Sequence, residues 1–167
     1  MSAPISELNF VTARRAVRVL RPDSPSQAVS LARQCRASYT AGGTWLQPAY
    51  ERDQCWPENL VALNASWPGF WGLEDGPNGL TVGAMTSLAE MARHPLVRDY
   101  LPPLAKFLNL VAGPGVRALG TVGGNLIVGG DLSALAMALD VRVDVVGHAG
   151  VRILPLSQWL RERTSED

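Results

Sequence analysis

Apolar and polar positions in the first part of the chain predict short strands around one amphipathic helix. A serine–proline pair marks the helix start, because serine caps helix N-termini and proline fits the first turn. Apolar residues then recur at helical spacing. The predicted elements are a strand over 16–20, a helix over 24–35, and strands over 38–40 and 59–63. This order predicts a small α/β unit with a right-handed crossover.

Beyond about residue 65 the pattern changes to hairpins and helices. The turn signal at 75–79 is strong, since it combines aspartate, asparagine, proline and glycine, and a second hairpin is predicted to turn at 148–150. His94-Pro95 is expected to end a helix, and the helix over 132–139 is apolar enough to be buried. The predicted elements are strands over 69–73, 80–84, 141–145 and 151–154, and helices beginning near Ser87, Leu101, Leu132 and Leu156.

This change of pattern divides the chain into an N-terminal arm (1–15), a first small α/β lobe (16–64) and a second α+β lobe (65–167). Each predicted lobe carries one glycine-dense stretch, at 41–44 and at 120–125. Glycine tolerates positive φ and lets backbone N–H groups approach a ligand, and successive N–H groups form anion-binding nests. The two stretches therefore predict a pyrophosphate held between them. The alternative is two tight turns that need glycine for their geometry alone.

Composition excludes several classes of function. Lys and Arg number 15, Asp and Glu number 15, and the formal net charge is zero, which argues against a dedicated nucleic-acid binder. The first ten residues lack the order of a signal peptide, and no apolar run is long enough to span a bilayer. We therefore expect a soluble, cytoplasmic protein that binds neither nucleic acid nor membrane.

The titratable residues indicate neither a catalytic group nor a metal site. The two histidines, His94 and His148, fall at a predicted helix end and in a turn. Cys35 and Cys55 form no C-x-x-C pair, which excludes a zinc ribbon or an iron–sulfur cluster built from this chain alone. We expect reduced thiols, with a disulfide as the alternative. Asp131 opens an apolar helix and is interpreted as a helix cap, as an acceptor for sugar-like hydroxyls, or as both.

Residues 113–118 match the pattern G-x-G-x-x-A, a form of the dinucleotide fingerprint. That fingerprint requires a preceding strand and a following helix, whereas a helix is predicted before this segment and a glycine turn after it. We therefore reject a nicotinamide-dinucleotide site here. Arg117 within it is interpreted as a solvated side chain, with contact to a phosphate or a partner as the alternative.

Four tryptophans gather in the middle of the chain, at Trp45, Trp56, Trp67 and Trp71. Loops rich in aromatic residues often contact a flat ring or a protein partner. For Trp67 and Trp71 a place in the hydrophobic core is an equally good interpretation.

The order of the motifs resembles a known family. The motifs are Ala41-Gly42-Gly43-Thr44, the segments 82–86 and 94–97, Arg117, the segment 120–126, Ala138-Leu139-Asp140 and the segment 152–156. Over about residues 17–160 they resemble the FAD-binding domain of the molybdenum hydroxylases. This domain belongs to the medium (flavin) subunit of the xanthine dehydrogenase, carbon monoxide dehydrogenase and aldehyde oxidoreductase type. The family normally continues into a separate C-terminal domain, so the chain resembles a truncated member.

The resemblance implies a two-lobed α+β fold of the vanillyl-alcohol-oxidase (PCMH) type, with FAD between the lobes and its pyrophosphate on both glycine turns. Ala112 and Gly120 would make backbone contacts, Thr121 and Asn125 would offer polar groups, and Asp131 would accept a hydroxyl. No catalytic residue and no metal ligand is implied. The implied cofactor-binding residues are Ala41, Gly42, Gly43, Thr44, Trp45, Leu46, Ala112, Gly120, Thr121, Gly123, Gly124, Asn125 and Asp131.

The implied function is that of an electron-transfer subunit, in which flavin passes electrons from iron–sulfur clusters to NAD or another acceptor. Its partners would be a molybdenum-cofactor subunit and an iron–sulfur subunit, which would hold the molybdopterin and the clusters. The alternative is a non-catalytic scaffold subunit with lost or weakened FAD binding, because Trp45 replaces the family's usual aspartate or small polar residue and the chain is short. We also expect Gly43→Val or Gly123→Val to abolish FAD retention while leaving the fold largely intact.

Overall fold

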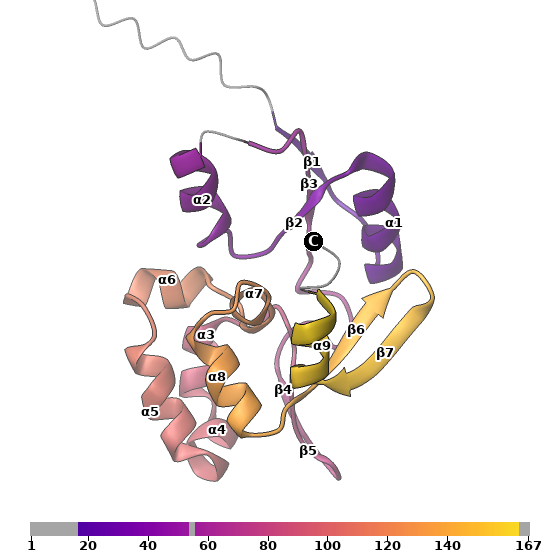
Figure 1. Ribbon diagram of the computed structural model, residues 1–167. Coiled ribbons are helices and arrows are strands. Elements are labelled where there is room, and N and C mark those ends of the chain that lie inside the picture. The colour runs from indigo at the N-terminus through magenta and orange to yellow at the C-terminus, as the bar shows by residue number, and fades with distance from the viewer. Residues whose placement is uncertain (1–16, 54–55, 164–167) are drawn as a thin grey trace, which may run out of the picture.

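The N-terminal part of the molecule is a three-stranded parallel sheet with two helices (Figure 1). The computed structural model describes residues 17–53 and 56–163, so the predicted N-terminal arm lies outside the described residues. Strand β3 lies in the middle and pairs with both of its neighbours in parallel, in the order β1-β3-β2. The elements are β1 (Arg18–Leu20), α1 (Pro25–Cys35), β2 (Ser38–Thr40), α2 (Leu46–Asp53) and β3 (Asn59–Ala62).

Helix α1 forms as the sequence predicts. The Ser24 hydroxyl accepts a hydrogen bond of 3.2 Å from the N–H of Gln27, and Pro25 occupies the first helical position. The helix ends where Arg36 turns left-handed at φ 47°. Its residue Ala28 is buried in a small apolar cluster with Val61 of β3, and this cluster fixes the helix against the sheet.

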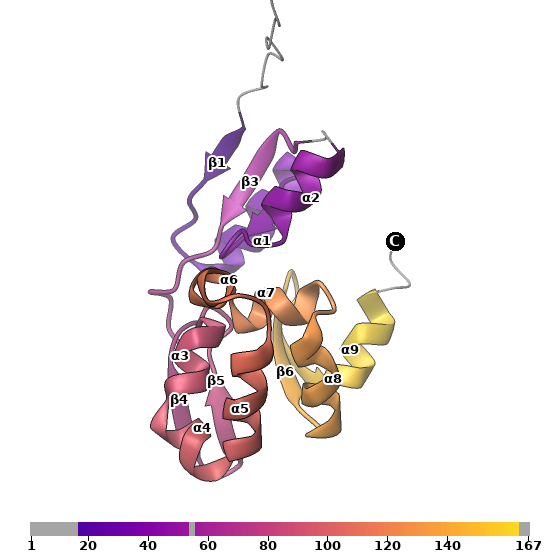
Figure 2. The same cartoon turned by 90° about the vertical axis from the view of Figure 1, so that its left-hand side faces the viewer.

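The rest of the chain combines two antiparallel hairpins with short helices (Figures 1 and 2). Both views show α6 and α7 on the side that faces the parallel sheet. The hairpins are β4 (Leu73–Gly76) with β5 (Gly79–Val82), and β6 (Arg142–Gly147) with β7 (Gly150–Pro155). The helices are α3 (Leu88–Arg93), α4 (Pro95–Tyr100), α5 (Pro102–Leu110), α6 (Pro114–Leu119), α7 (Val122–Ile127), α8 (Asp131–Ala138) and α9 (Leu156–Arg163).

One predicted element is wrong, and another is correct but incomplete. Residues 69–73 do not form a strand, because Gly69 and Gly72 adopt positive φ of 75° and 95°, and the first hairpin strand begins only at Leu73. His94 ends α3 as expected, but it also starts α4, since its Nδ1 accepts the N–H of Leu96 at 3.3 Å. Four short helices, α2, α4, α6 and α7, are absent from the sequence-based prediction.

The larger hydrophobic core lies under α3, α5 and the hairpin β4–β5. Its buried members include Leu88, Val97, Leu108, Val122 and Leu132. Helix α8 is not wholly buried as expected: Leu132 faces this core, but Met137 on another side is 49% exposed.

The tryptophans divide between core and surface. Trp67 is buried in the N-terminal cluster, where it makes an edge-to-face contact with Phe70. Trp71 is 58% exposed, which contradicts a place in the core. Trp45 and Trp56 are exposed as well. The thiol of Cys35, at the end of α1, is half-buried and free, whereas Cys55 lies outside the described residues.

Candidate functional site

The first glycine stretch joins β2 to α2 and leaves its amide hydrogens unused. The N–H of Gln47 donates to the carbonyl of Gly43 at 3.1 Å, so helical bonding begins at Gly43. No backbone N–H of residues 42–46 donates to a protein atom within the part of the chain that the structure describes. Gly43 adopts φ +70°, a conformation that L side chains rarely take. A turn with several free N–H groups at a helix start is a ready site for an anion.

The second glycine stretch is built differently, as the first turn of helix α7. The Thr121 side chain caps this helix by accepting the N–H of Gly124 at 3.1 Å. The N–H of Val122 donates to Thr86 at 2.9 Å, and the N–H of Gly123 donates to Ala84 at 2.8 Å. The N–H groups at the start of α7 therefore already have protein acceptors.

Gly123 is required by packing. A Cβ at this position would lie 2.8 Å from the Ala84 Cβ and 3.0 Å from the Ala84 carbonyl oxygen. The first spacing is shorter than real Cβ atoms show and the second is at the tight end of those observed, so the α7 backbone makes this close approach to Ala84 because residue 123 is glycine. The expectation that Gly123→Val leaves the fold largely intact is therefore wrong.

Segment 83–88 holds the start of α7 in place. Ser87 pairs with Thr121 in a single antiparallel bridge, and the N–H of Leu88 donates to Gly120 at 2.9 Å. Ser87 also forms a capping box with Glu90, whose carboxylate accepts both the backbone N–H and the hydroxyl of Ser87. The hydrogen bond from the Ser87 backbone is the main cause that lowers the pKa of the Glu90 carboxyl, against an opposing contribution from burial.

Gly42 brings the two glycine stretches together. A Cβ at Gly42 would overlap the carbonyl oxygen of Leu119, at the end of α6, and would also crowd the N–H of Gly120. A Cβ built at Gly120 would in turn lie 3.4 Å from the Thr44 hydroxyl. Loop 41–44 and residues 119–120 thus touch through backbone, and this contact requires glycine at 42.

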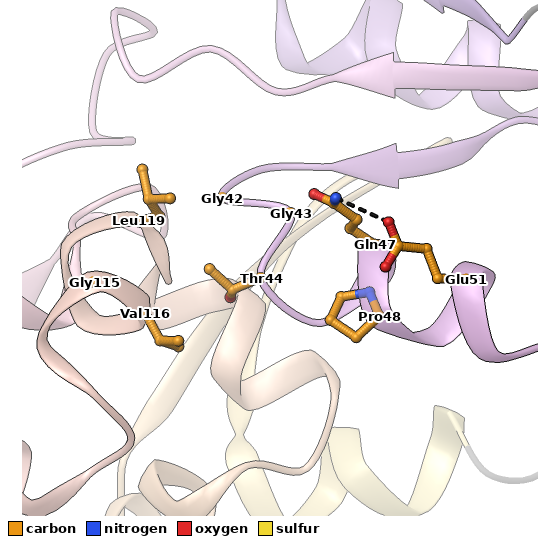
Figure 3. Close-up of a pocket in the computed structure, with 9 residues that line it drawn as sticks. All are labelled: Gly42, Gly43, Thr44, Gln47, Pro48, Glu51, Gly115, Val116 and Leu119. Atoms are coloured by element: carbon orange, nitrogen blue, oxygen red, sulfur yellow. Dashed lines mark hydrogen bonds between the residues drawn. The ribbon is translucent and has the colours of Figure 1, made fainter.

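A cavity of about 250 Å³ opens beside this contact, between α2 and α6 (Figure 3). Its walls come from the loop and one face of α2 on one side and from α6 on the other. The lining residues are Gly42, Gly43, Thr44, Gln47, Pro48, Glu51, Gly115, Val116 and Leu119. The free N–H groups of the first glycine stretch belong to residues at one end of this cavity.

Ala112 and Arg117 form a structural pair. Ala112 is exposed and adopts a left-handed φ of 50° just after α5. The guanidinium of Arg117 donates to the carbonyl oxygens of Val111 at 3.0 Å and Ala112 at 2.6 Å. A cation at the C-terminal end of a helix is favourable. Arg117 therefore closes α5, which corrects its interpretation as a solvated side chain.

Asn125 and Asp131 meet at the start of α8. Gly130 occupies the N-cap position, and Asp131 is the first helical residue with an exposed side chain. The side-chain oxygen of Asn125 accepts the N–H of Leu132 at 3.0 Å, so Asn125 caps the helix. The cap interpretation of Asp131 is wrong. Within the described residues, the Asp131 carboxylate and the Asn125 amide nitrogen have no protein partner.

The remaining predicted residues flank the first glycine stretch. Ala41, Thr44 and Leu46 are half-buried, whereas Trp45 is 55% exposed directly beside the free N–H groups. The sequence analysis missed Gln47, Pro48 and Glu51, because α2 was not predicted. A signal existed: these residues follow Thr44 at the spacing of one helical face.

The described ranges show neither a membrane-spanning helix nor a metal site. No helix within residues 17–53 and 56–163 is both long and apolar enough to cross a membrane. In the same ranges, no three or more His, Cys, Asp or Glu side chains are placed to hold a metal ion together.

Residues 15–167 match the family model described as the FAD binding domain in molybdopterin dehydrogenase. The chain belongs to this family. The chain is 33% identical over 139 residues to the carbon monoxide dehydrogenase medium chain of Hydrogenophaga pseudoflava. The matched residues cover 80% of this chain and 48% of the relative. The chain is 27% identical to the xanthine dehydrogenase FAD-binding subunit of Escherichia coli O157:H7, covering 76% of this chain and 44% of that one.

Solved structures agree with the sequence comparison. The carbon monoxide dehydrogenase of Hydrogenophaga pseudoflava superposes with a TM-score of 0.78 at 32% identity, covering 84% of this chain and 50% of that chain. The quinoline 2-oxidoreductase of Pseudomonas putida 86 gives a TM-score of 0.77 at 29% identity, with the same coverage of both chains. The chain thus spans about half the length of the relatives it matches. The expected family and its mixed α and β fold are confirmed.

The described residues fit the cofactor that the family implies. Residues 42–46 supply unpaired N–H donors for a pyrophosphate, which is an observation on this chain and independent of the family match. The cavity between α2 and α6 adjoins them, and Asp131 presents a free carboxylate for a hydroxyl donor.

Proposed function

We propose that this chain is the FAD-binding electron-transfer component of a molybdenum-containing hydroxylase or dehydrogenase. The free N–H groups of residues 42–46 carry the proposal, because Gly42, Gly43 and Thr44 among them line a cavity. FAD lies between a lobe of residues 16–64 and a lobe of residues 65–167, which meet where Gly42 contacts Leu119. The bound flavin supplies the electron transfer, and the chain binds it, orients it and shields it from water.

The two glycine stretches have unequal roles in this proposal. The pyrophosphate accepts hydrogen bonds from the N–H groups of residues 42–46, whereas the N–H groups of Gly123 and Gly124 already have protein acceptors. The second stretch therefore contributes by placing Gly120, Thr121 and Asn125 beside the first.

In this proposal the flavin half of the cofactor extends from the pyrophosphate toward the start of α8. The Asn125 amide nitrogen and the Asp131 carboxylate face its ribityl hydroxyls, and the Ala112 backbone lines the same pocket. Trp45 covers the pyrophosphate from outside, where its exposed ring excludes water.

The partners in this proposal are a molybdenum-cofactor subunit and an iron–sulfur subunit, which deliver electrons to the flavin. NAD or another soluble acceptor then takes them. The names of the relatives support this assembly, since they are chains or subunits of dehydrogenases. The scaffold alternative is less well supported, because it gives no role to the N–H groups of residues 42–46, which the described part of the chain leaves unpaired beside a cavity.

An absorption spectrum of the purified chain, alone and with its partner subunits, tests the proposal. We expect flavin bands that survive gel filtration and are lost in Gly43→Val, because a β-branched residue at φ +70° displaces the N–H groups. The matched control is Gly79→Val in the β4–β5 turn, which has φ +110° and equally open surroundings. It also places a β-branched side chain at positive φ, but away from the site, so it should retain flavin. Absence of flavin bands in both preparations contradicts the proposal and favours a scaffold.

A further inference from the structure

One face of helix α2 forms a continuous wall of the cavity. Thr44, Gln47, Pro48 and Glu51 follow one another at intervals of three, one and three residues, which places them on the same helical face. The rise of 1.5 Å per residue separates the first from the last by about 10 Å. The cavity therefore extends from the free N–H groups at the start of α2 toward the carboxylate of Glu51.

Gln47 orients that carboxylate. Its side-chain Nε2 donates to Glu51 Oε1 at 3.1 Å, as Figure 3 shows. Glu51 Oε2 has no hydrogen-bond donor among the described residues, so it is available to a ligand in the cavity. Side chains on a helix lean toward its N-terminus, so the Glu51 carboxylate leans toward the pyrophosphate end.

The charge pattern restricts what this carboxylate binds. It repels a phosphate and accepts hydrogen bonds, so within FAD its partner is a group that donates hydrogen bonds. Vicinal sugar hydroxyls meet this requirement, and a carboxylate on a ribose is a common solution in nucleotide sites. The opposite wall consists of Gly115, Val116 and Leu119, which offers an apolar surface to a flat base.

The flavin half and the adenosine half of FAD leave the pyrophosphate in different directions, and different side chains line each direction. In the proposed function, the ribityl hydroxyls lie toward Asn125 and Asp131, at the start of α8. The α2 side of the pyrophosphate then remains for the adenosine half. The cavity between α2 and α6 offers a carboxylate, an amide and an apolar wall, which suit a ribose and a purine.

We propose that Glu51, held by Gln47, binds the ribose hydroxyls of the adenosine half of FAD, so that the α2–α6 cavity selects FAD over FMN. This inference rests on the proposed function, because it takes the pyrophosphate to lie on residues 42–46. It adds a subsite for the adenosine and assigns a specificity role to two residues outside the glycine motifs.

Titration of the flavin-free 167-residue chain with FAD, FMN, ADP and 2′,3′-dideoxy-ADP, followed by calorimetry, tests the subsite. We expect Glu51→Gln to weaken FAD and ADP binding about tenfold, since a hydrogen bond to a charged group is lost. FMN binding should stay unchanged. Wild type should prefer ADP over the dideoxy compound, and Glu51→Gln should lose this preference. The matched control is Glu74→Gln, an exposed glutamate on the β4–β5 hairpin.

The titrations separate failure of the Glu51 subsite from failure of the proposed function. If wild type binds FAD and FMN equally, or if Glu51→Gln weakens both alike, the subsite is overturned while the proposed function stands. A preference for ADP that persists in Glu51→Gln also overturns it. If wild type binds neither flavin, alone or with partner subunits, the proposed function and the subsite fail together.

Discussion

The two glycine stretches look alike in sequence but differ in what their glycines do. In the first, Gly43 supplies a positive φ and the N–H groups of 42–46 remain free. In the second, Gly123 makes room for Ala84, and the N–H groups at the start of α7 have protein acceptors. The first stretch keeps unpaired donors within the described residues, and the second is tightly packed against the protein.

This difference shows how one amino acid serves two physical requirements within a single site. Gly42 belongs to both, since it lies in the turn with unpaired N–H groups and also allows backbone contact with Leu119. The second stretch thereby buttresses the first. A substitution in either stretch is expected to affect cofactor binding. Substitutions at the packed glycines Gly42 and Gly123 should also lower the stability of the fold more than a substitution at Gly43.

The largest effect is expected from Gly42→Ala. The new Cβ overlaps the carbonyl oxygen of Leu119, and neither backbone can yield without separating loop 41–44 from α6. Overpacking of this severity costs about 3 kcal/mol or more. Urea unfolding followed by circular dichroism should show the loss, and flavin retention should fall with it.

Gly43→Ala is the matched control for that prediction. The new Cβ has no atom within 4 Å, so the only loss of folding free energy is the strain of a Cβ at φ +70°. This strain costs about 1 kcal/mol. Equal destabilisation by the two substitutions would contradict the assignment of Gly42 to the contact with Leu119.

A smaller loss is expected from Gly123→Ala. The Cβ lies 2.8 Å from the Ala84 Cβ and 3.0 Å from its carbonyl oxygen, a crowding that costs about 1–3 kcal/mol. The double variant with Ala84→Gly removes one of the two clashes, so it should be more stable than the sum of the single effects indicates. Denaturant unfolding of all four proteins measures this coupling. Simple additivity would show that Ala84 is not what Gly123 makes room for.

Much of the fold follows from local signals. The Ser24-Pro25 start of α1, the hairpin turns and the capping box of Ser87 are encoded by neighbouring residues, so the sequence predicts them. Helices α2, α4, α6 and α7 escaped prediction because they are short and begin beside glycine or proline. The error at 69–73 has the opposite cause, since apolar residues suggested a strand that Gly69 and Gly72 interrupt.

In the site too, some features follow from neighbouring residues and others depend on residues distant in sequence. Glycine density drew attention to both stretches, but their different uses depend on Ala84 and Leu119, which are distant in sequence. No local pattern reveals that the N–H of Gly123 is already bonded. Likewise, Asn125 rather than Asp131 caps α8, because the fold returns residue 125 to the start of that helix.

The smallest effect is expected when one threonine from each glycine stretch is replaced. Thr121 is buried at only 6% exposure, and its hydroxyl caps α7 by accepting the N–H of Gly124. Thr121→Val keeps the side-chain shape and removes the acceptor, so unfolding in urea should show a loss of about 1 kcal/mol. The Thr44 hydroxyl makes no hydrogen bond within the described residues, so Thr44→Val should leave the stability of the flavin-free chain nearly unchanged. Similar losses in both variants would mean that the first glycine stretch is capped by the protein too, and that its N–H groups are not reserved for an anion.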